Sequence, residues 1–248
     1  MGANVVETRP SIVVDDVRKD FLLRHTHSLK ETFVAWVQRK KSGSSTFQAL
    51  DGVEFHVGEG ESVAVLGLNG SGKSTLLKLI SGVLEPDAGR VLTRGRLAGL
   101  IEVGAGFHPD LSGRENVYLN AAILGMNRAE TEARFDEIVA FSEIGEFIDQ
   151  EVKHYSSGMF LRLAFSVAIH VELDILLVDE ILSVGDAPFR EKCKTKILEL
   201  ADQGKTMLVV SHNMSMIKEI CTRGIVLKKG KLIFDGPVDE AIEAMNKR

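Results

Sequence analysis

The sequence predicts an α/β fold built around a central, mostly parallel sheet. The apolar run Val63–Leu66 leads through a glycine-rich loop into a helical pattern that begins at Leu76. The continuous apolar run Ile175–Val178 is typical of a strand at the centre of a parallel sheet. Beyond residue 188, helix, strand and helix patterns alternate, as in domains whose helices pack on a parallel sheet.

The first part of the chain predicts a strand and an inserted helix. Residues 11–21 have an apolar strand pattern. Residues 28–41 predict an amphipathic helix, because Ser28 and Glu31 form a capping box and four apolar side chains fall on one face. This helix either covers its own sheet, or it faces a membrane partner or the bilayer surface, for which Trp36 and a basic end are suitable.

The remaining elements are predicted from apolar periodicity and from Gly and Pro turns. The sequence has no internal repeats, and its length allows one large α/β domain or two small ones; we expect a single domain over residues 1–248. In chain order the predicted elements are a strand over 53–57, a turn at 58–60, a strand over 62–66, a turn at 86–89, short strands within 90–100, mainly helix over 114–172 with breaks at Gly125 and Gly145, a helix over 188–203, a strand over 206–210, a helix from about 214 and a hairpin at 228–230.

The composition indicates an ordinary globular protein. The chain has 248 residues, of which 44% are hydrophobic and 26% charged, and its net charge of −5 argues against nonspecific binding to nucleic acid. No apolar run reaches the roughly 18 residues that span a membrane, and residues 1–9 lack the apolar core of a secretory signal. Cys193 and Cys221 lack metal-ligand spacing and are expected to be reduced. A cytoplasmic protein is expected, with any membrane role depending on a partner.

The loop GLNGSGKST, which runs from Gly67 to Thr75, is a phosphate-binding pattern in its required strand–loop–helix context. Its glycines let backbone N–H groups approach phosphate oxygens, and the positive end of the following helix favours an anion. Lys73 supplies a charge for the β- and γ-phosphates, and Ser74 an oxygen for Mg²⁺. The sequence therefore predicts a nucleoside triphosphate with Mg²⁺. The expected contacts are Gly67, Asn69, Gly70, Ser71, Gly72, Lys73, Ser74 and Thr75.

Two carboxylates, Asp179 and Glu180, directly follow the buried strand 175–178. The carboxyl ends of parallel strands form the sheet edge where nucleotides bind. Asp179 is therefore expected to hold Mg²⁺, and Glu180 to orient and deprotonate the water that attacks the γ-phosphate.

Between these motifs the segment YSSGMFLRLAFSVA begins at Tyr155, and with it the chain resembles the ATP-binding cassette (ABC) family over nearly its whole length. Family members carry a signature near Leu-Ser-Gly-Gly-Gln at the start of a helix. Ser156 and Gly158 match it, whereas Tyr155, Ser157 and Met159 depart. The resemblance implies a P-loop ABC ATPase fold with an antiparallel β-subdomain and an α-helical subdomain at about 103–172. It also implies that Ser156 and Gly158 contact the γ-phosphate of ATP held by a second copy of the chain, for which a helix N-terminus is suited.

The resemblance assigns further residues. Asp186 ends the segment SVGD, which matches the family's loop after the catalytic carboxylate. His212 follows the last core strand, where it would contact the γ-phosphate and help hold the attacking water. Glu102 stands where the family usually has a glutamine that reaches toward Mg²⁺ and this water. Its carboxylate is expected to bind Mg²⁺ and to accept a hydrogen bond from the water, but it cannot donate one as an amide does. Phe21 is expected to stack on adenine, with Phe47 as the alternative.

Three segments, EVGAGFHPDLSGREN, YSSGM and EILSVGDAPFREKC, resemble one branch of the family. This branch contains ATPase subunits of bacterial exporters for lipid-linked polysaccharides such as O-antigen, teichoic acid and, most similar here, actinobacterial galactan. The implied partners are an integral membrane permease contacted near 104–114, a second copy of the chain, and the lipid-linked polysaccharide through the permease. The implied location is the cytoplasmic face of the membrane. Some members carry a C-terminal carbohydrate-binding domain, which we expect this chain to lack.

Other functions are less consistent with the sequence. A soluble ABC ATPase of iron–sulfur cluster assembly fits the length, but does not explain the helix at 28–41 or Glu102. A DNA-repair ATPase would need a long heptad segment, and a translation factor two copies of the motifs; the sequence has neither. An exporter ATPase for a drug or a lipid would carry the same motifs, so the cargo depends on the resemblance alone.

Overall fold

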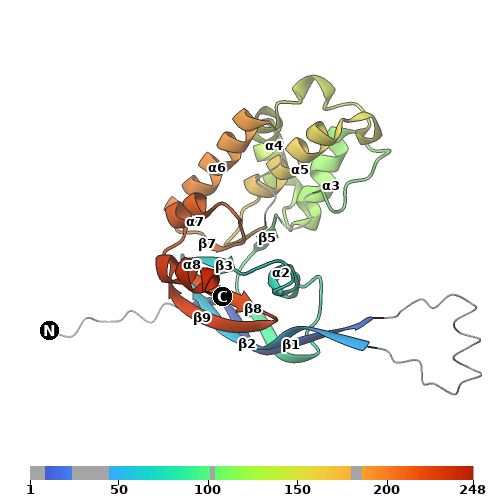
Figure 1. Ribbon diagram of the computed structural model, residues 1–248. Coiled ribbons are helices and arrows are strands. Elements are labelled where there is room, and N and C mark those ends of the chain that lie inside the picture. The colour runs from blue at the N-terminus through green and yellow to red at the C-terminus, as the bar shows by residue number, and fades with distance from the viewer. Residues whose placement is uncertain (1–8, 24–44, 101–103, 180–185, 248) are drawn as a thin grey trace, which may run out of the picture.

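The computed structural model describes residues 9–23, 45–100, 104–179 and 186–247, which form two sheets and their covering helices (Figure 1). The predicted helix at 28–41 lies outside the described residues, as do Glu102, Glu180 and residues 183–185. No helix among the described residues is long and apolar enough to cross a bilayer.

The central sheet confirms the predicted α/β fold. Its strands lie in the order β5-β6-β7-β3-β8-β9; neighbours from β5 to β8 are parallel, and β9 pairs antiparallel with β8. β6 and β7 are buried throughout, as their unbroken apolar sequences predict. The strands are β3 Ser62–Leu66, β5 Leu97–Gly99, β6 Ile175–Val178, β7 Thr206–Val209, β8 Arg223–Lys228 and β9 Lys231–Pro237.

A second, antiparallel sheet has the strand order β2-β1-β4, with β1 Pro10–Leu23, β2 Ser45–Gly58 and β4 Ala88–Thr93. Its apolar side packs with the helix α2, Lys73–Ile80, against one face of the central sheet. β2 begins at Ser45, earlier than the strand predicted at 53–57, because its first residues pair with the end of β1. Phe21 and Phe47 are partners in this extension.

Three helices, α3 Gly113–Ile123, α4 Arg128–Ser142 and α5 Ser157–His170, form the upper lobe in Figure 1. Capping boxes begin α3 and α4, so their first N–H groups are satisfied locally. Two 3₁₀ turns, Gly145–Phe147 and Val152–His154, connect α4 to α5. The buried side chains of this group form a core of their own.

The other face of the central sheet is covered by α6 Ala187–Asp202, α7 Met214–Ile220 and α8 Val238–Asn246. α5 belongs to both cores: Leu163 packs within the helical group, whereas Phe165 packs toward the sheet and against Phe189 of α6, with ring centroids 6.1 Å apart. A movement of α5 would therefore change the packing in both the helical core and the core beside the central sheet.

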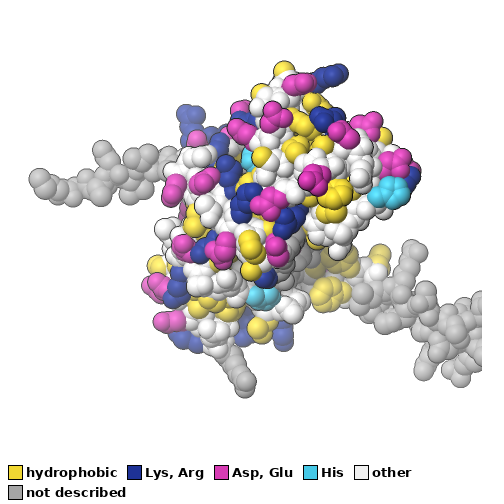
Figure 2. All heavy atoms as spheres, turned by 90° about the horizontal axis from the view of Figure 1, so that it is seen from above, with side chains coloured by type: hydrophobic (Ala, Val, Ile, Leu, Met, Phe, Trp, Pro, Cys, Tyr) yellow, Lys and Arg dark blue, Asp and Glu magenta, His cyan; other side chains and the backbone are white. Residues whose placement is uncertain are grey.

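The exposed surface carries charges of both signs. On the face seen in Figure 2, acidic and basic side chains are interspersed. Surface pairs include Arg114 with Asp149 and Lys153 with Asp110, at 2.7 and 3.3 Å. Exposed pairs of this kind contribute little to stability, so the cores rather than the ion pairs hold the fold together.

Candidate nucleotide site

The phosphate loop connects β3 to α2, as predicted, and two of its glycines are required by close backbone packing. Gly67 has φ 151°, and a Cβ there would collide with the carbonyl oxygen of Leu227 on β8. Gly72, the N-cap of α2, has φ 110°, and a Cβ would lie 2.7 Å from the carbonyl oxygen of Ala49 on β2. Any side chain at these positions would push the loop off both neighbouring strands.

The loop presents positive charge at the start of α2. Gly72 has no side chain that could cap the first N–H groups of the helix. The Lys73 ammonium folds back over the loop and donates to the carbonyl oxygens of Gly67 at 2.8 Å and Leu68 at 3.2 Å. Uncapped N–H groups and a nearby ammonium are the elements of an anion site.

A pocket of about 440 Å³ opens over the loop. Asp179, directly after β6, and Val210, directly after β7, lie in its wall because both parallel strands end at the edge where β3 ends. The structure thus brings Asp179 together with Lys73 and Ser74. The other lining residues are Phe47, Ala49, Asn69, Gly70, Ser71, Gly72 and Thr75.

The oxygen donors of this pocket fit Mg²⁺. A Ser74 hydroxyl and an Asp179 carboxylate are hard ligands, and Mg²⁺ is usually held by one or two such groups together with substrate phosphates and water. Within the described ranges, no cluster of three or more His, Cys, Asp or Glu side chains is placed to hold a metal by itself. Such a site suits a metal that arrives with a phosphate ligand.

Two aromatic residues were candidates for the adenine contact, and the structure places Phe47 in the pocket wall. Phe47 is 47% exposed, which leaves its ring accessible. Phe21 does not line the pocket; it pairs with Phe47 across β1 and β2, and its ring lies 5.8 Å from the Lys19 ammonium. The pocket therefore favours the alternative, Phe47.

The comparisons with known proteins identify the family. Residues 50–183, more than half of the chain, match the ABC transporter family. The chain belongs to the ABC transporter family. This agrees with the resemblance carried by the phosphate loop and the segment that begins at Tyr155.

Three curated relatives are named for the export of O-antigen or teichoic acids. The chain is 47% identical over 221 residues to the O-antigen export system ATP-binding protein of Myxococcus xanthus, covering 87% of this chain and 51% of the relative. It is 49% identical over 197 residues to a protein of the same description from Klebsiella pneumoniae, covering 79% and 80%. The teichoic acids export ATP-binding protein of Lactococcus lactis is 42% identical over 236 residues, covering 95% and 50%. The chain thus spans about half the length of the Myxococcus and Lactococcus relatives.

Solved structures confirm the ABC ATPase fold. A dimeric ATP-binding cassette in a post-hydrolysis state with ADP and inorganic phosphate matches with a TM-score of 0.71 at 24% identity, covering 92% of this chain and 98% of that one. The ATP-binding subunit of an ABC transporter matches with a TM-score of 0.73 at 22% identity, covering 96% and 95%.

The ABC signature lies away from this chain's own phosphate pocket. Ser156 is the N-cap of α5, and its Oγ accepts a hydrogen bond from the Met159 N–H at 3.2 Å. It is exposed, and Gly158 is half-buried in the first turn. Neither residue lines the pocket that contains Lys73. The start of α5 is therefore accessible to a ligand that does not sit in the same chain's loop.

Arg162 is a residue whose importance the motif analysis did not single out. Its guanidinium donates to Glu143 at 2.7 Å and to Asp186 at 2.6 Å, and lies 4.8 Å from the Phe189 ring centroid. Burial opposes ionisation of Asp186, but the hydrogen bond and charge of Arg162 outweigh it and lower the pKa of that carboxyl. Arg162 thus connects α5 to the N-terminus of α6. In the sequence, the only indication of this role was that Arg162 is a single cation within a long apolar helix.

His212 lies two residues beyond Val210 and is exposed, at the same sheet edge as the pocket. Its position after β7 agrees with the predicted element order. Asp186, the N-cap of α6, is also exposed.

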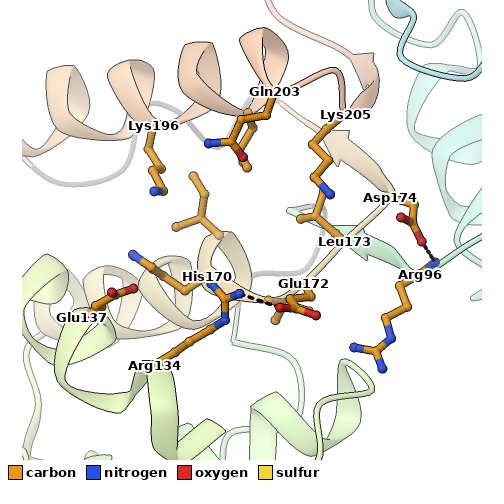
Figure 3. A pocket seen from close by; sticks show the side chains of 13 residues that line it. Arg96, Arg134, Glu137, His170, Glu172, Leu173, Asp174, Lys196, Gln203 and Lys205 are labelled. Carbon is orange, nitrogen blue, oxygen red and sulfur yellow. Dashed lines mark hydrogen bonds and ion pairs between the residues drawn. The ribbon is translucent and has the colours of Figure 1, made fainter. Parts of the chain in front are cut away.

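A second hollow, of about 430 Å³, lies at the opposite ends of the same strands, before β6 and β7 begin (Figure 3). Its two arginines are paired: the Arg134 guanidinium donates to Glu172 at 2.7 Å, and the Arg96 guanidinium lies 3.3 Å from Glu130. The Asp174 carboxylate accepts a hydrogen bond from the backbone N–H of Arg96 at 2.8 Å. His170, at the end of α5, forms part of its wall. This hollow is separate from the phosphate pocket.

We predict that His170 makes the fold sensitive to acid. Burial lowers the pKa of His170, and the charges of Lys196 and Arg134 act in the same direction. The contact of Nδ1 with the Ser166 carbonyl oxygen at 2.7 Å and the charge of Glu137 oppose this shift without cancelling it. In the unfolded chain His170 takes up a proton near pH 6.5, whereas in the folded chain it does so only at lower pH. The free energy of unfolding therefore falls as the pH drops through that value. In His170→Gln, the slope of unfolding free energy against pH should decrease by up to about one proton between pH 5 and 7.

Urea denaturation over this pH range measures the slope. His154→Gln, at an exposed histidine, controls for the loss of one titratable side chain. Parallel curves for wild type and His170→Gln would rule out the protonation effect.

Proposed function

We propose that this chain is the ATP-hydrolysing subunit of an exporter that moves a lipid-linked polysaccharide across the cytoplasmic membrane with a separate permease. The observation that carries the proposal is the pocket that gathers Lys73, Ser74 and Asp179, in a chain 47–49% identical to O-antigen export ATP-binding proteins. An O-antigen-like polymer and a cell-wall galactan are both cargoes of this class; the galactan is the finer proposal that the sequence resemblance suggests.

In the proposed reaction each residue has a distinct role. Lys73 and the first N–H groups of α2 orient the β- and γ-phosphates of ATP. Ser74 and Asp179 would hold Mg²⁺, which would supply positive charge beside the phosphates. Glu180 takes the proton of the attacking water, and His212 contacts the γ-phosphate. Glu102 accepts a hydrogen bond from the same water.

The active unit is a dimer that holds two ATP molecules. Ser156 and Gly158 of one chain contact the γ-phosphate bound at Lys73 of the other. This assignment is supported by the exposure of Ser156, the partial exposure of Gly158 and the absence of both from the pocket of their own chain. Asp186 enters the same interface. Because ATP then binds the closed dimer better than the open one, hydrolysis reopens it.

The permease contact is supported by an apolar groove of about 400 Å³ that is lined by α3, α5, β5 and the segment after α2. Gly104 and Ala105, within the segment 104–114 predicted to meet the permease, line it. Val83 and Ile123 also line it and are 56% and 57% exposed. Side chains this apolar and this accessible suit a helix of a membrane partner. The chain would then lie at the cytoplasmic face of the membrane.

A soluble role in iron–sulfur cluster assembly is not favoured, because the three curated relatives described above all take their names from O-antigen or teichoic acid export. An exporter for another cargo remains the alternative. Copurification of the membrane protein that binds this chain, followed by identification of the polymer that accumulates without it, would distinguish the cargoes.

We predict that Phe47→Ala weakens ATP binding at least about fivefold, because base–aromatic stacking contributes roughly 1–3 kcal/mol. Calorimetric titration with ATP and Mg²⁺ measures the affinity. Phe21→Ala is the matched control and should change it less than about twofold. A larger effect from Phe21 than from Phe47 would reverse the assignment.

We predict that Glu180→Gln keeps nucleotide binding but lowers ATP turnover at least about 10²-fold, because the amide cannot accept the proton of water. The variant should also accumulate an ATP-dependent dimer, which size-exclusion chromatography with light scattering detects. Glu191→Gln, at an exposed glutamate of α6, is the control. Near-normal turnover in Glu180→Gln would refute the proposed base.

We predict that Ile123→Asp reduces recovery of the permease in copurification at least about tenfold, because a carboxylate in an apolar contact is left without a partner. ATP turnover of the isolated chain should change less than about twofold. Leu119→Asp, on α3 but outside the groove, is the control. Equal recovery of the permease with Ile123→Asp would place the contact elsewhere.

A further inference from the structure

A third hollow, of about 640 Å³, lies beside the phosphate loop on the side away from Asp179. The loop forms one wall, the end of β8 and its hairpin turn form another, and the last turn of α8 forms the third. Figure 1 shows α8 lying over β8 and β9. Its volume falls within the range of about 300–1,000 Å³ that small-molecule sites occupy.

The lining has two chemical parts. Leu68, Ile233 and Met245 provide apolar surface, and the first two are 71% and 49% exposed. Three lysines also line the hollow, and none of the described residues that line it is acidic. Within the described part of the chain, the side chains of these lysines form no ion pair or hydrogen bond. They are Lys228, Lys229 and Lys247.

A buried polar atom lies where this hollow adjoins the phosphate pocket. Ser71 lines both this hollow and the phosphate pocket, and the residue is only 4% exposed. Its Oγ has no hydrogen-bond partner among the described residues. Since buried hydroxyls normally have a partner, this one points to a ligand or water on one side of the loop.

We propose that this hollow binds a single anionic amphiphile, meaning a molecule with a linear apolar chain and a terminal phosphate or carboxylate. The apolar chain lies on Leu68, Ile233 and Met245, and the head group meets the three lysines. Three cations without a matching carboxylate select against a cationic or uncharged amphiphile. The site is distinct from the phosphate pocket, although the two share Asn69, Gly70 and Ser71.

The test is a calorimetric titration with decyl phosphate, kept below its critical micelle concentration. Saturating ADP and Mg²⁺ occupy the phosphate loop throughout, so that the head group cannot bind there. We expect saturable binding of one molecule per chain. Decanol and decyltrimethylammonium should bind at least about tenfold more weakly, because each lacks the charge-assisted contacts.

Two variants locate the site. The combined change Lys228→Ala, Lys229→Ala and Lys247→Ala should weaken decyl phosphate binding at least about tenfold, and so should Ile233→Asp. Lys231→Ala is the matched control: it lies in the same hairpin but pairs with Asp51 at 3.1 Å and does not line the hollow. It should change the affinity less than about twofold.

Several results would overturn the proposal: no saturable binding while ADP is bound, equal affinity in the lysine and Ile233 variants, or equal binding of the cationic amphiphile. Vesicles that contain phosphatidic acid, added as a competitor, test whether a bilayer lipid is the occupant. Displacement of decyl phosphate by such vesicles would overturn the assignment to a free amphiphile. The titration measures binding alone, so its outcome is independent of the proposed role in export.

Discussion

The structure depends on how the phosphate loop is held between the two sheets. The Gly230 N–H, in the hairpin turn after β8, donates to the Ser71 carbonyl oxygen at 3.0 Å, and the Asp51 N–H of β2 donates to the Gly230 carbonyl oxygen at 2.9 Å. These two hydrogen bonds connect the loop, the central sheet and the antiparallel sheet in one path. They form only if the backbones approach closely, which is why Gly72 faces the Ala49 carbonyl without a Cβ. The anion site is therefore fixed before any phosphate binds.

A second connection joins the signature helix to the rest of the molecule. Arg162 is 19% exposed and contacts carboxylates from two different segments, one after α4 and one before α6. Lys192 of α6 completes the cluster by donating to Glu143 at 3.0 Å, and the pKa of that carboxyl is lowered by the Lys192 hydrogen bond and the nearby Arg162. A two-state switch needs an element whose position both sites can bias. α5 meets this requirement, because its apolar side chains pack in two cores and its one cation reaches Asp186.

Much of this arrangement could be predicted from local sequence. Strand–loop–helix order around Lys73, the acidic residue after Ile175–Val178 and the helix capped by Ser156 are each encoded within a few residues, where turn and capping chemistry decide the conformation. The contribution of Phe47 was less predictable, since the pairing of β1 with β2 brings both Phe21 and Phe47 to the same region, and only tertiary packing selects which ring lines the pocket. Arg162 was hidden for a related reason: its partners are 19 and 24 residues away in sequence, so no local pattern reveals them.

The position of the loop also has a consequence for any ligand that binds beside it. Leu68 exposes its side chain to the third hollow, while its carbonyl oxygen accepts from the Lys73 ammonium and from the Ser71 N–H. A molecule that packs on the Leu68 side chain therefore acts on the same peptide groups that orient Lys73. Coupling between two binding sites is reciprocal. If an occupant of the hollow shifts these groups and changes the affinity for nucleotide by some factor, bound nucleotide must change the affinity for the occupant by the same factor. The backbone contacts that hold the phosphate loop thus also connect it to the third hollow, so a ligand bound there can alter the affinity for nucleotide.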